Sequence, residues 1–196
     1  HGVLDSPDIP LNVSRSYLQS DAQVKKISNH IAKKVADRLD ELFRNERDLF
    51  ESKWDSLKVF VQYGMLSDEK FYDRAVKYDL MTDVAGKHFT LDEYRTLTES
   101  EQTDKDGSLI WLYASDRDAQ YAAIARAEAK GYSILLMDGP LDVHAVSQLE
   151  QKLEKTRFVR VDSDTIDKLI AKSEVKAVEL SEEEQSALRA IFSARL

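Results

Sequence analysis

Apolar residues recur at steps of three and four along the first half of the chain, a spacing that predicts amphipathic helices. The first stripe comprises Val24, Ile27, Ile31, Val35, Leu39 and Leu42. It predicts one long helix from about Asp21 to Phe43. The second stripe comprises Leu49, Phe50, Trp54 and Leu57. It predicts a helix that ends near Gly64. The polar run at 67–70 is typical of an N-cap with first-turn acids, and it predicts a third helix that reaches Tyr78.

The second half alternates apolar runs of strand length with helical segments. The runs at 109–113, 132–137 and 158–161 predict strands, and helices are expected between them at 117–129 and 142–153. Such alternation is typical of a βαβαβ unit with a mainly parallel sheet. We therefore expect the α/β class, with an N-terminal helical bundle followed by a small βαβαβ subdomain of three α/β/α layers.

Four segments follow from these patterns. Residues 1–20 are expected to form a loop and a short helix, and residues 21–82 a helical connector. The small α/β/α subdomain is expected at 83–162, and a charged link into a further domain at 163–196. The first residue is His1, and we expect the chain to be a piece of a longer protein. Within the small subdomain, the residues at 84–87 predict a turn, those at 91–97 one or two helical turns, and those at 101–107 a loop.

Composition excludes several classes of protein. The 196 residues include 28 basic and 36 acidic ones, a formal net charge of −8, and no cysteine. A chain without cysteine has no disulfide, thiol nucleophile or thiolate metal site. No apolar run approaches the roughly 18 residues of a membrane helix. The acidic balance argues against a nucleic-acid partner, because binding phosphates usually needs a basic surface. The lysines at 25, 26, 33 and 34 are interpreted as a solvated helix face.

Candidate chemistry is sparse in most of the chain. The four histidines, which are His1, His30, His88 and His144, lie in separate segments, so no metal site is expected. The acids that follow the predicted strands are Asp138, Asp162, Asp164 and Asp167. Carboxylates at strand ends can hold magnesium, which leaves open a small magnesium-dependent phosphoryl-transfer or nuclease-like enzyme. Acids in the first turn of a helix explain Asp162 and Asp164 equally well.

The opening loop offers a more specific candidate. Asn12 or Ser14 can cap the short helix that begins at Arg15, after a loop stiffened by two prolines. On spacing alone, Arg15 is expected to pair with an acid such as Asp8. A guanidinium presented on a loop can instead stabilise the charge that develops on a transferring γ-phosphoryl group.

Residues 2–19 read GVLDSPDIPLNVSRSYLQ. This stretch closely resembles the signature of the ninety-kilodalton heat-shock chaperone family. The resemblance continues more loosely through Tyr94, the WLYA run at 111–114 and LLMDGPLD at 135–142. It covers residues 2–161, and the remainder resembles the link into the family's C-terminal domain.

The resemblance implies a middle-domain fragment of an ATP-dependent chaperone that assists protein folding under stress. By the motif match, Arg15 would reach the γ-phosphate of ATP bound to the N-terminal domain. Gln19 would help to hold the same loop, and Asn12 would brace it or contact the ATP-binding domain. ATP and magnesium would belong to the intact protein, and we expect neither a cofactor nor ATPase activity in this fragment alone.

The implied partners are the chaperone's own N-terminal ATP-binding and C-terminal dimerisation domains, client proteins and other chaperones, in the cytoplasm and without a membrane. The helix after Asp142 is a candidate client surface, with Val143, His144 and Ser147 as contact residues. Bacterial relatives tend to carry an acid and an aromatic residue where this sequence has Val143 and His144. The alternative is a scaffold module that binds proteins independently of nucleotide, in which Arg15 is structural.

Overall fold

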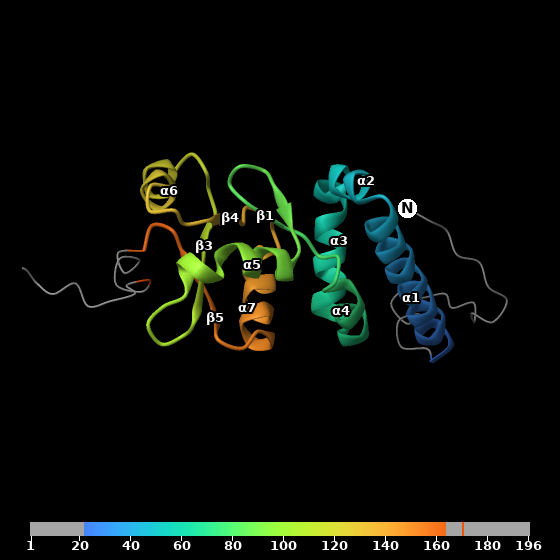
Figure 1. Cartoon of the computed structure of the whole chain (residues 1–196). Helices are drawn as coiled ribbons and strands as arrows, with labels where there is room; N and C mark the ends of the chain where they lie inside the picture. Colours follow the sequence, from blue (N-terminus) through green and yellow to red (C-terminus); the bar gives the residue numbers. More distant parts are fainter. Residues whose placement is uncertain (1–21, 164–169, 171–196) are drawn as a thin grey trace, which may run out of the picture.

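Helices make up the first half of the described chain, as the apolar stripes predict. The computed structural model describes residues 22–163 and residue 170. The helices are α1 (Ala22–Asn45), α2 (Arg47–Ser52), α3 (Trp54–Ser67) and α4 (Glu69–Ala75). They lie together beside the α/β part (Figure 1). Their shared core includes Ala36, Phe50, Trp54, Val61, Met65 and Tyr78.

The predicted stripe of α1 is only partly buried. Ala36 is fully buried, and Leu39 and Leu42 pack against the core of the helical part. Ile31 and Val35, however, are 39% and 47% exposed. The small side chain of Ala36 lets α1 approach its neighbours closely, so the face around Ala36 is buried and the row through Ile31 and Val35 is not. The long amphipathic helix is thus present, but its apolar stripe is buried only in part.

The second predicted helix is two helices. A break at Lys53 separates α2 from α3, where the Lys53 amide donates to the Phe50 carbonyl at 3.1 Å. Ser52 contributes to this tight turn, because its hydroxyl donates to the Leu49 carbonyl at 2.8 Å. The break redirects the chain so that Phe50 and Trp54 both enter the core, with ring centroids 5.7 Å apart.

The predicted N-cap of the third helix is confirmed. The Asp68 carboxylate accepts hydrogen bonds from the backbone amides of Lys70 at 2.8 Å and Phe71 at 3.3 Å. These bonds satisfy two amides that a helix start leaves without partners. The cap fixes the angle at which α4 leaves α3, and it brings Phe71 against Gly64.

Gly64 is the point of close approach between α3 and α4. A Cβ atom at this position would lie 2.7 Å from Cε1 of Phe71 and 2.8 Å from its Cδ1. We expect Gly64→Ala to lower the free energy of unfolding by about 1–2 kcal/mol, although alanine favours a helix by about 1 kcal/mol, because overpacking costs more. Chemical denaturation measures the change. Ser56→Ala, on the exposed side of α3, is the control, and an equal loss there would contradict the steric explanation.

The parallel βαβαβ unit is confirmed. Its central strand, β3 (Leu109–Ala114), pairs in parallel with β4 (Ile134–Leu136) and with β5 (Thr156–Arg160). The crossovers contain α6 (Tyr121–Glu128) and α7 (Asp142–Lys152). Helix α5 (Leu91–Gln102) precedes β3 and is longer than predicted, so the loop expected at 101–107 begins only after Gln102.

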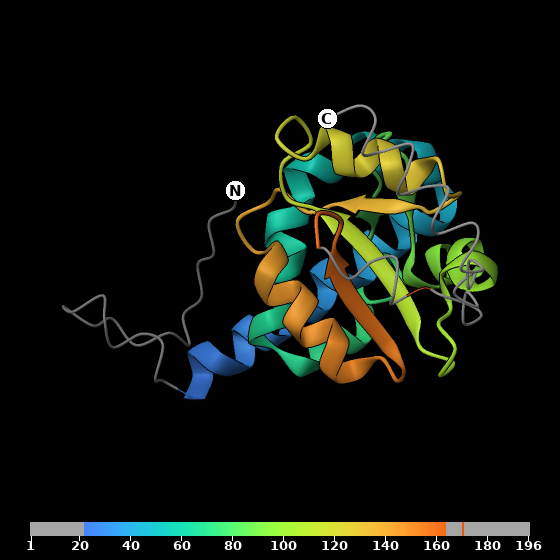
Figure 2. The same ribbon diagram turned by 90° about the vertical axis from the view of Figure 1, so that its left-hand side faces the viewer.

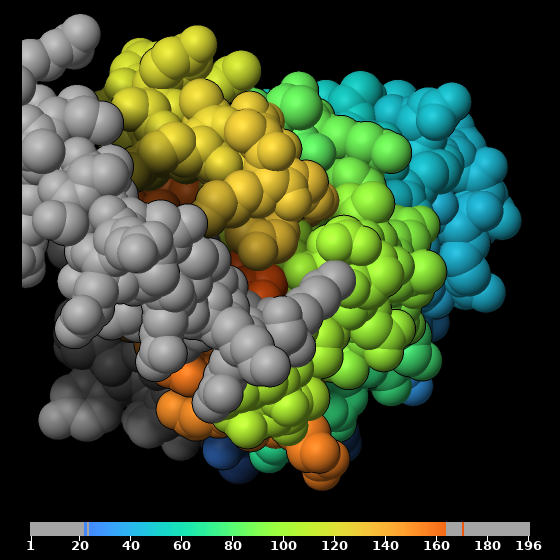
Figure 3. Space-filling view, turned by 60° about the vertical axis from the view of Figure 1, so that its left-hand side comes forward, coloured from blue at the N-terminus to red at the C-terminus, as the bar shows by residue number. Residues whose placement is uncertain are grey.

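Three layers form around this sheet, as expected. On one face, Trp111, Leu135 and Phe158 pack with side chains from α5 and α7. On the other face, Ile110 and Leu112 pack with side chains from α6. Figure 2 shows the sheet between α6 (yellow) and α7 (orange). The space-filling view shows α6 (yellow) and α5 (green) at the surface on this side (Figure 3).

A short hairpin joins the helical part to the sheet. Its strands, β1 (Met81–Thr82) and β2 (His88–Phe89), pair antiparallel. The predicted turn lies between them, where the Asp83 carboxylate accepts from two backbone amides and Gly86 has a φ of +85°. The Val84 amide donates to the Ile134 carbonyl at 3.0 Å, and an isolated bridge joins Asp83 to Leu135, so the hairpin lies beside β4 as a separate two-stranded sheet. Residues 81–82, which the sequence places in the connector, therefore lie with the α/β part.

Candidate functional site

The sequence-predicted residues fall into two groups. Asn12, Arg15 and Gln19 lie outside the described residues. Val143, His144 and Ser147, by contrast, all stand on the exposed side of α7. Val143 is 74% exposed, and the Ser147 hydroxyl donates to its carbonyl at 3.0 Å. The structure thus presents the predicted client-contact residues on one exposed helix face.

Asp142 fixes the start of that helix. Asp142 is the first residue of α7, and its side chain is buried. Its Oδ2 accepts a hydrogen bond from the Gly139 amide at 2.8 Å. A Cβ atom on Gly139 would approach this oxygen to 3.0 Å, so a side chain here would press on the Asp142 carboxylate. The carboxylate also neutralises the positive end of the helix dipole.

The same carboxylate ties α7 to α3. Lys58 donates to Asp142 Oδ2 at 2.8 Å, and Gln62 donates to Asp142 Oδ1 at 2.7 Å. Further along α7, the Gln148 amide donates to the Met65 carbonyl at 2.9 Å. The helical part therefore holds the candidate client face through buried polar contacts.

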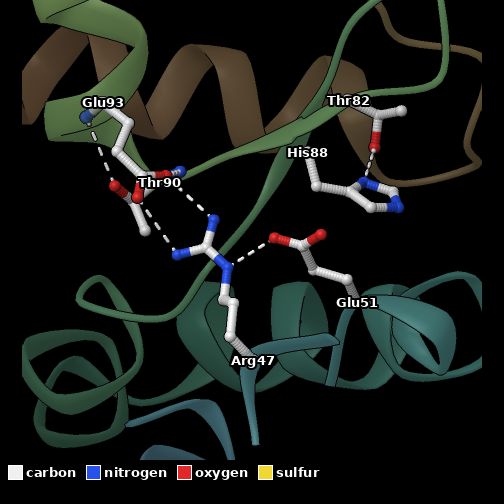
Figure 4. A network of polar contacts seen from close by, with 6 residues as sticks. All are labelled: Arg47, Glu51, Thr82, His88, Thr90 and Glu93. Carbon is white, nitrogen blue, oxygen red and sulfur yellow. Dashed lines mark hydrogen bonds and ion pairs between the residues drawn. The ribbon is translucent and has the colours of Figure 1, made fainter. Parts of the chain in front are cut away.

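A second polar network joins the two parts on another side. Arg47, at the start of α2, donates from both Nη atoms to the carboxylate of Glu93, at 3.1 and 2.9 Å (Figure 4). It also pairs with Glu51 on its own helix. Glu93 accepts from the Thr90 amide and Thr90 from the Glu93 amide, which is a capping box for α5. The hydrogen bond from Arg47 lowers the pKa of Glu93, so this carboxylate stays charged at neutral pH.

No metal centre is visible in the part of the chain that the structure describes, where no three acidic or histidine side chains gather to hold an ion. The Asp162 carboxylate accepts from Arg160 Nε at 2.6 Å, which lowers its pKa. Asp138 is exposed, and Asp164 and Asp167 lie outside the described residues. His88 Nδ1 lies 3.0 Å from the Thr82 hydroxyl.

Among the described residues, no helix combines the length and the apolar character that crossing a bilayer requires. The helix that carries Lys25, Lys26, Lys33 and Lys34 exposes all four lysines, in agreement with their interpretation as a solvated face.

Sequence reasoning missed both networks that join the two parts. The capping box could have been found, because a threonine three residues before a glutamate at 90–93 is its usual signature. The bonds from Lys58 and Gln62 to Asp142 could not, because they connect positions 84 and 80 residues apart. No local pattern indicates such pairs.

Comparison with known proteins agrees with the sequence resemblance. The model of the family described as Hsp90 protein matches residues 1–196. The chaperone protein HtpG of Porphyromonas gingivalis is 66% identical over 196 residues, which is the whole of this chain and 29% of that protein. HtpG of Bacteroides fragilis is 60% identical over 196 residues, which is again the whole of this chain and 29% of that protein. The chain thus spans less than a third of the relatives it matches.

A solved structure supports the fold independently. The middle domain of a Plasmodium falciparum heat shock protein superposes with a TM-score of 0.55 at 15% identity. The match covers 71% of this chain and 58% of that one. At this identity the likeness concerns the fold alone.

Proposed function

The chain belongs to the Hsp90 protein family, and we propose that it is the middle-domain segment of an ATP-dependent chaperone of the HtpG type. The observation that carries the proposal is the match to this family over residues 1–196, together with the middle-domain fold of the described part. The parent chaperone would bind ATP and magnesium in a separate N-terminal domain and dimerise through a C-terminal domain. It would assist protein folding in the cytoplasm.

Arg15 is the group we propose to act on ATP. A guanidinium delivered from a second domain stabilises the charge of the transferring phosphoryl group only when the two domains close. Hydrolysis would then depend on closure, and this chain alone would be inactive. Gln19 would hold the same loop, and Asn12 would brace it or contact the ATP-binding domain.

The exposed face of α7 is the proposed client surface. Val143 offers apolar area to non-native chains, and His144 and Ser147 add polar contacts beside it. Other chaperones are further proposed partners. What supports this assignment is that Val143, at 74% exposure, stands beside the exposed His144 and Ser147, so one helix face offers all three side chains to a partner.

We expect Arg15→Ala in the full-length chaperone to lower ATP turnover at least about tenfold and to leave ATP affinity nearly unchanged. An interaction made mainly in the transition state has this effect on rate and not on ground-state binding. Steady-state turnover and equilibrium nucleotide binding measure the two quantities. Arg117→Ala is the matched control, because Arg117 is an exposed arginine on a loop of the α/β part. Unchanged turnover in a folded Arg15→Ala protein would favour the nucleotide-independent scaffold.

A further inference from the structure

A small cavity lies where the helical part meets the α/β part. Its lining includes three charged residues and one amide residue, which we refer to as the junction cluster; they are Lys58, Gln62, Asp79 and Asp142. The cavity volume is about 20 Å³, so it has no room for a ligand larger than a water molecule. Its importance therefore lies in how these side chains act on each other.

Asp79 is the member without a clear partner. It lies between α4 and β1, is only 7% exposed, and its Oδ1 is buried without a hydrogen bond in the described structure. Burial raises its pKa to about 7, with the charge of Lys58 opposing the rise and that of Asp142 adding to it. A carboxyl group in this position changes its charge near neutral pH.

Few other titratable groups face Asp79. Tyr72 of α4 and the neighbouring Tyr78 lie close enough to interact electrostatically with it. Burial raises the pKa of both phenols, so they remain neutral where Asp79 titrates. The remaining residues that line the cavity, from β1, β4, α7 and the segments beside them, carry no charge. Lys58 and Asp142 are therefore the charges that respond to Asp79.

We propose that the junction cluster is a proton-sensitive interlock that sets where the first turn of α7 lies against α3. With Asp79 protonated, Lys58 and Asp142 balance each other's charge. When Asp79 loses its proton, a second carboxylate competes for the Lys58 ammonium, and the hold of Lys58 on Asp142 weakens. Val143 and His144 follow Asp142 directly, so their face moves with it. The consequence for client binding rests on the proposed function, whereas the response to pH does not.

Nuclear magnetic resonance of the whole 196-residue chain tests the interlock without any client. Two signals report on it directly, because the Gly139 backbone amide and the Gln62 side-chain amide both donate to the Asp142 carboxylate. Spectra are recorded between about pH 5.5 and 8.5 in a His144→Gln background, which removes an exposed histidine from the same turn. We expect both signals to shift with a common midpoint near pH 7. The shift should disappear in Asp79→Asn.

A second pair of variants keeps the test decisive if Asp79→Asn does not fold. Lys58→Met removes the ammonium for which Asp79 and Asp142 compete, so the shift of both signals with pH should shrink or vanish. Lys152→Met is the matched control, since Lys152 of α7 also pairs across the junction, with Glu69, but lies outside the cavity. The proposal is overturned if the Gly139 and Gln62 signals do not titrate in this range. It is also overturned if Lys58→Met changes their titration no more than Lys152→Met does.

Thermal unfolding gives an independent measurement. A carboxyl group whose pKa is higher in the folded protein, here about 7 against 3.8, binds its proton more tightly when folded. Its contribution to stability therefore falls as the pH rises through this interval. We expect the unfolding temperature of the unmodified chain to decline relative to that of Asp79→Asn between about pH 5 and 8. Parallel curves for the two proteins would contradict the role of Asp79.

Discussion

Trp111→Ala is expected to lower the free energy of unfolding by about 4 kcal/mol, as large-to-small substitutions of buried aromatic residues do. Trp111 lies on the central strand β3 and is fully buried. Its ring packs edge-on against Tyr94 and Phe158, each with a centroid distance of 5.3 Å. Its indole nitrogen also donates to the Thr98 hydroxyl at 3.0 Å. The substitution removes contacts with both α5 and β5 at once.

Chemical denaturation followed by circular dichroism and fluorescence measures this loss. The chain has two tryptophans, Trp54 in the core of the helical part and Trp111 on one face of the sheet, so Trp54 still reports on the helical part after Trp111 is replaced. Trp111→Phe is the control. It keeps the aromatic packing and loses the bond to Thr98, so it should cost about 1–2 kcal/mol. A loss below about 1 kcal/mol for Trp111→Ala would mean that this face of the sheet is held by other contacts.

The sequence predicts the central strand β3 well. Because this strand is buried on both faces, the sequence shows a continuous apolar run there. It predicts the helical part less well. Periodicity shows which side of α1 is apolar but not what covers it, so the exposure of Ile31 and Val35 could not be foreseen. The break at Lys53 depends on where Phe50 and Trp54 fit in a core that later residues complete.

The candidate sites divide along a similar line. Arg15 is a candidate only because residues 2–19 resemble a chaperone signature. Composition and spacing alone do not distinguish it from an ordinary ion-pair arginine. The candidate client-contact residues on α7 also come from the resemblance, which indicates the helix after Asp142 as a client surface. The junction cluster could not be found this way, because its members come from α3, α7 and the segment between α4 and β1. Only the folded chain brings these residues together.

Asp142→Ala is expected to lower the free energy of unfolding by about 3 kcal/mol. The substitution leaves the Lys58 ammonium, the Gln62 amide and the Gly139 amide without their acceptor. The side chain of Lys58 is only 19% exposed, so water replaces the lost carboxylate poorly. Breaking a largely buried ion pair from one side is costly because an uncompensated charge remains. Chemical denaturation at constant pH measures the loss.

An exposed pair across the same junction provides the control. Glu69→Ala removes the partner of Lys152, but the Glu69 side chain is 76% exposed, so we expect no measurable loss of stability. The double variant Lys58→Met with Asp142→Ala removes both charges and should be less destabilised than the sum of the single variants. If the two losses simply add, Lys58 and Asp142 do not depend on each other, and α7 is held on α3 by its remaining contacts. A coupled pair instead makes the start of α7 depend on α3, and any change that reorients α3 would then reach Val143 through Asp142.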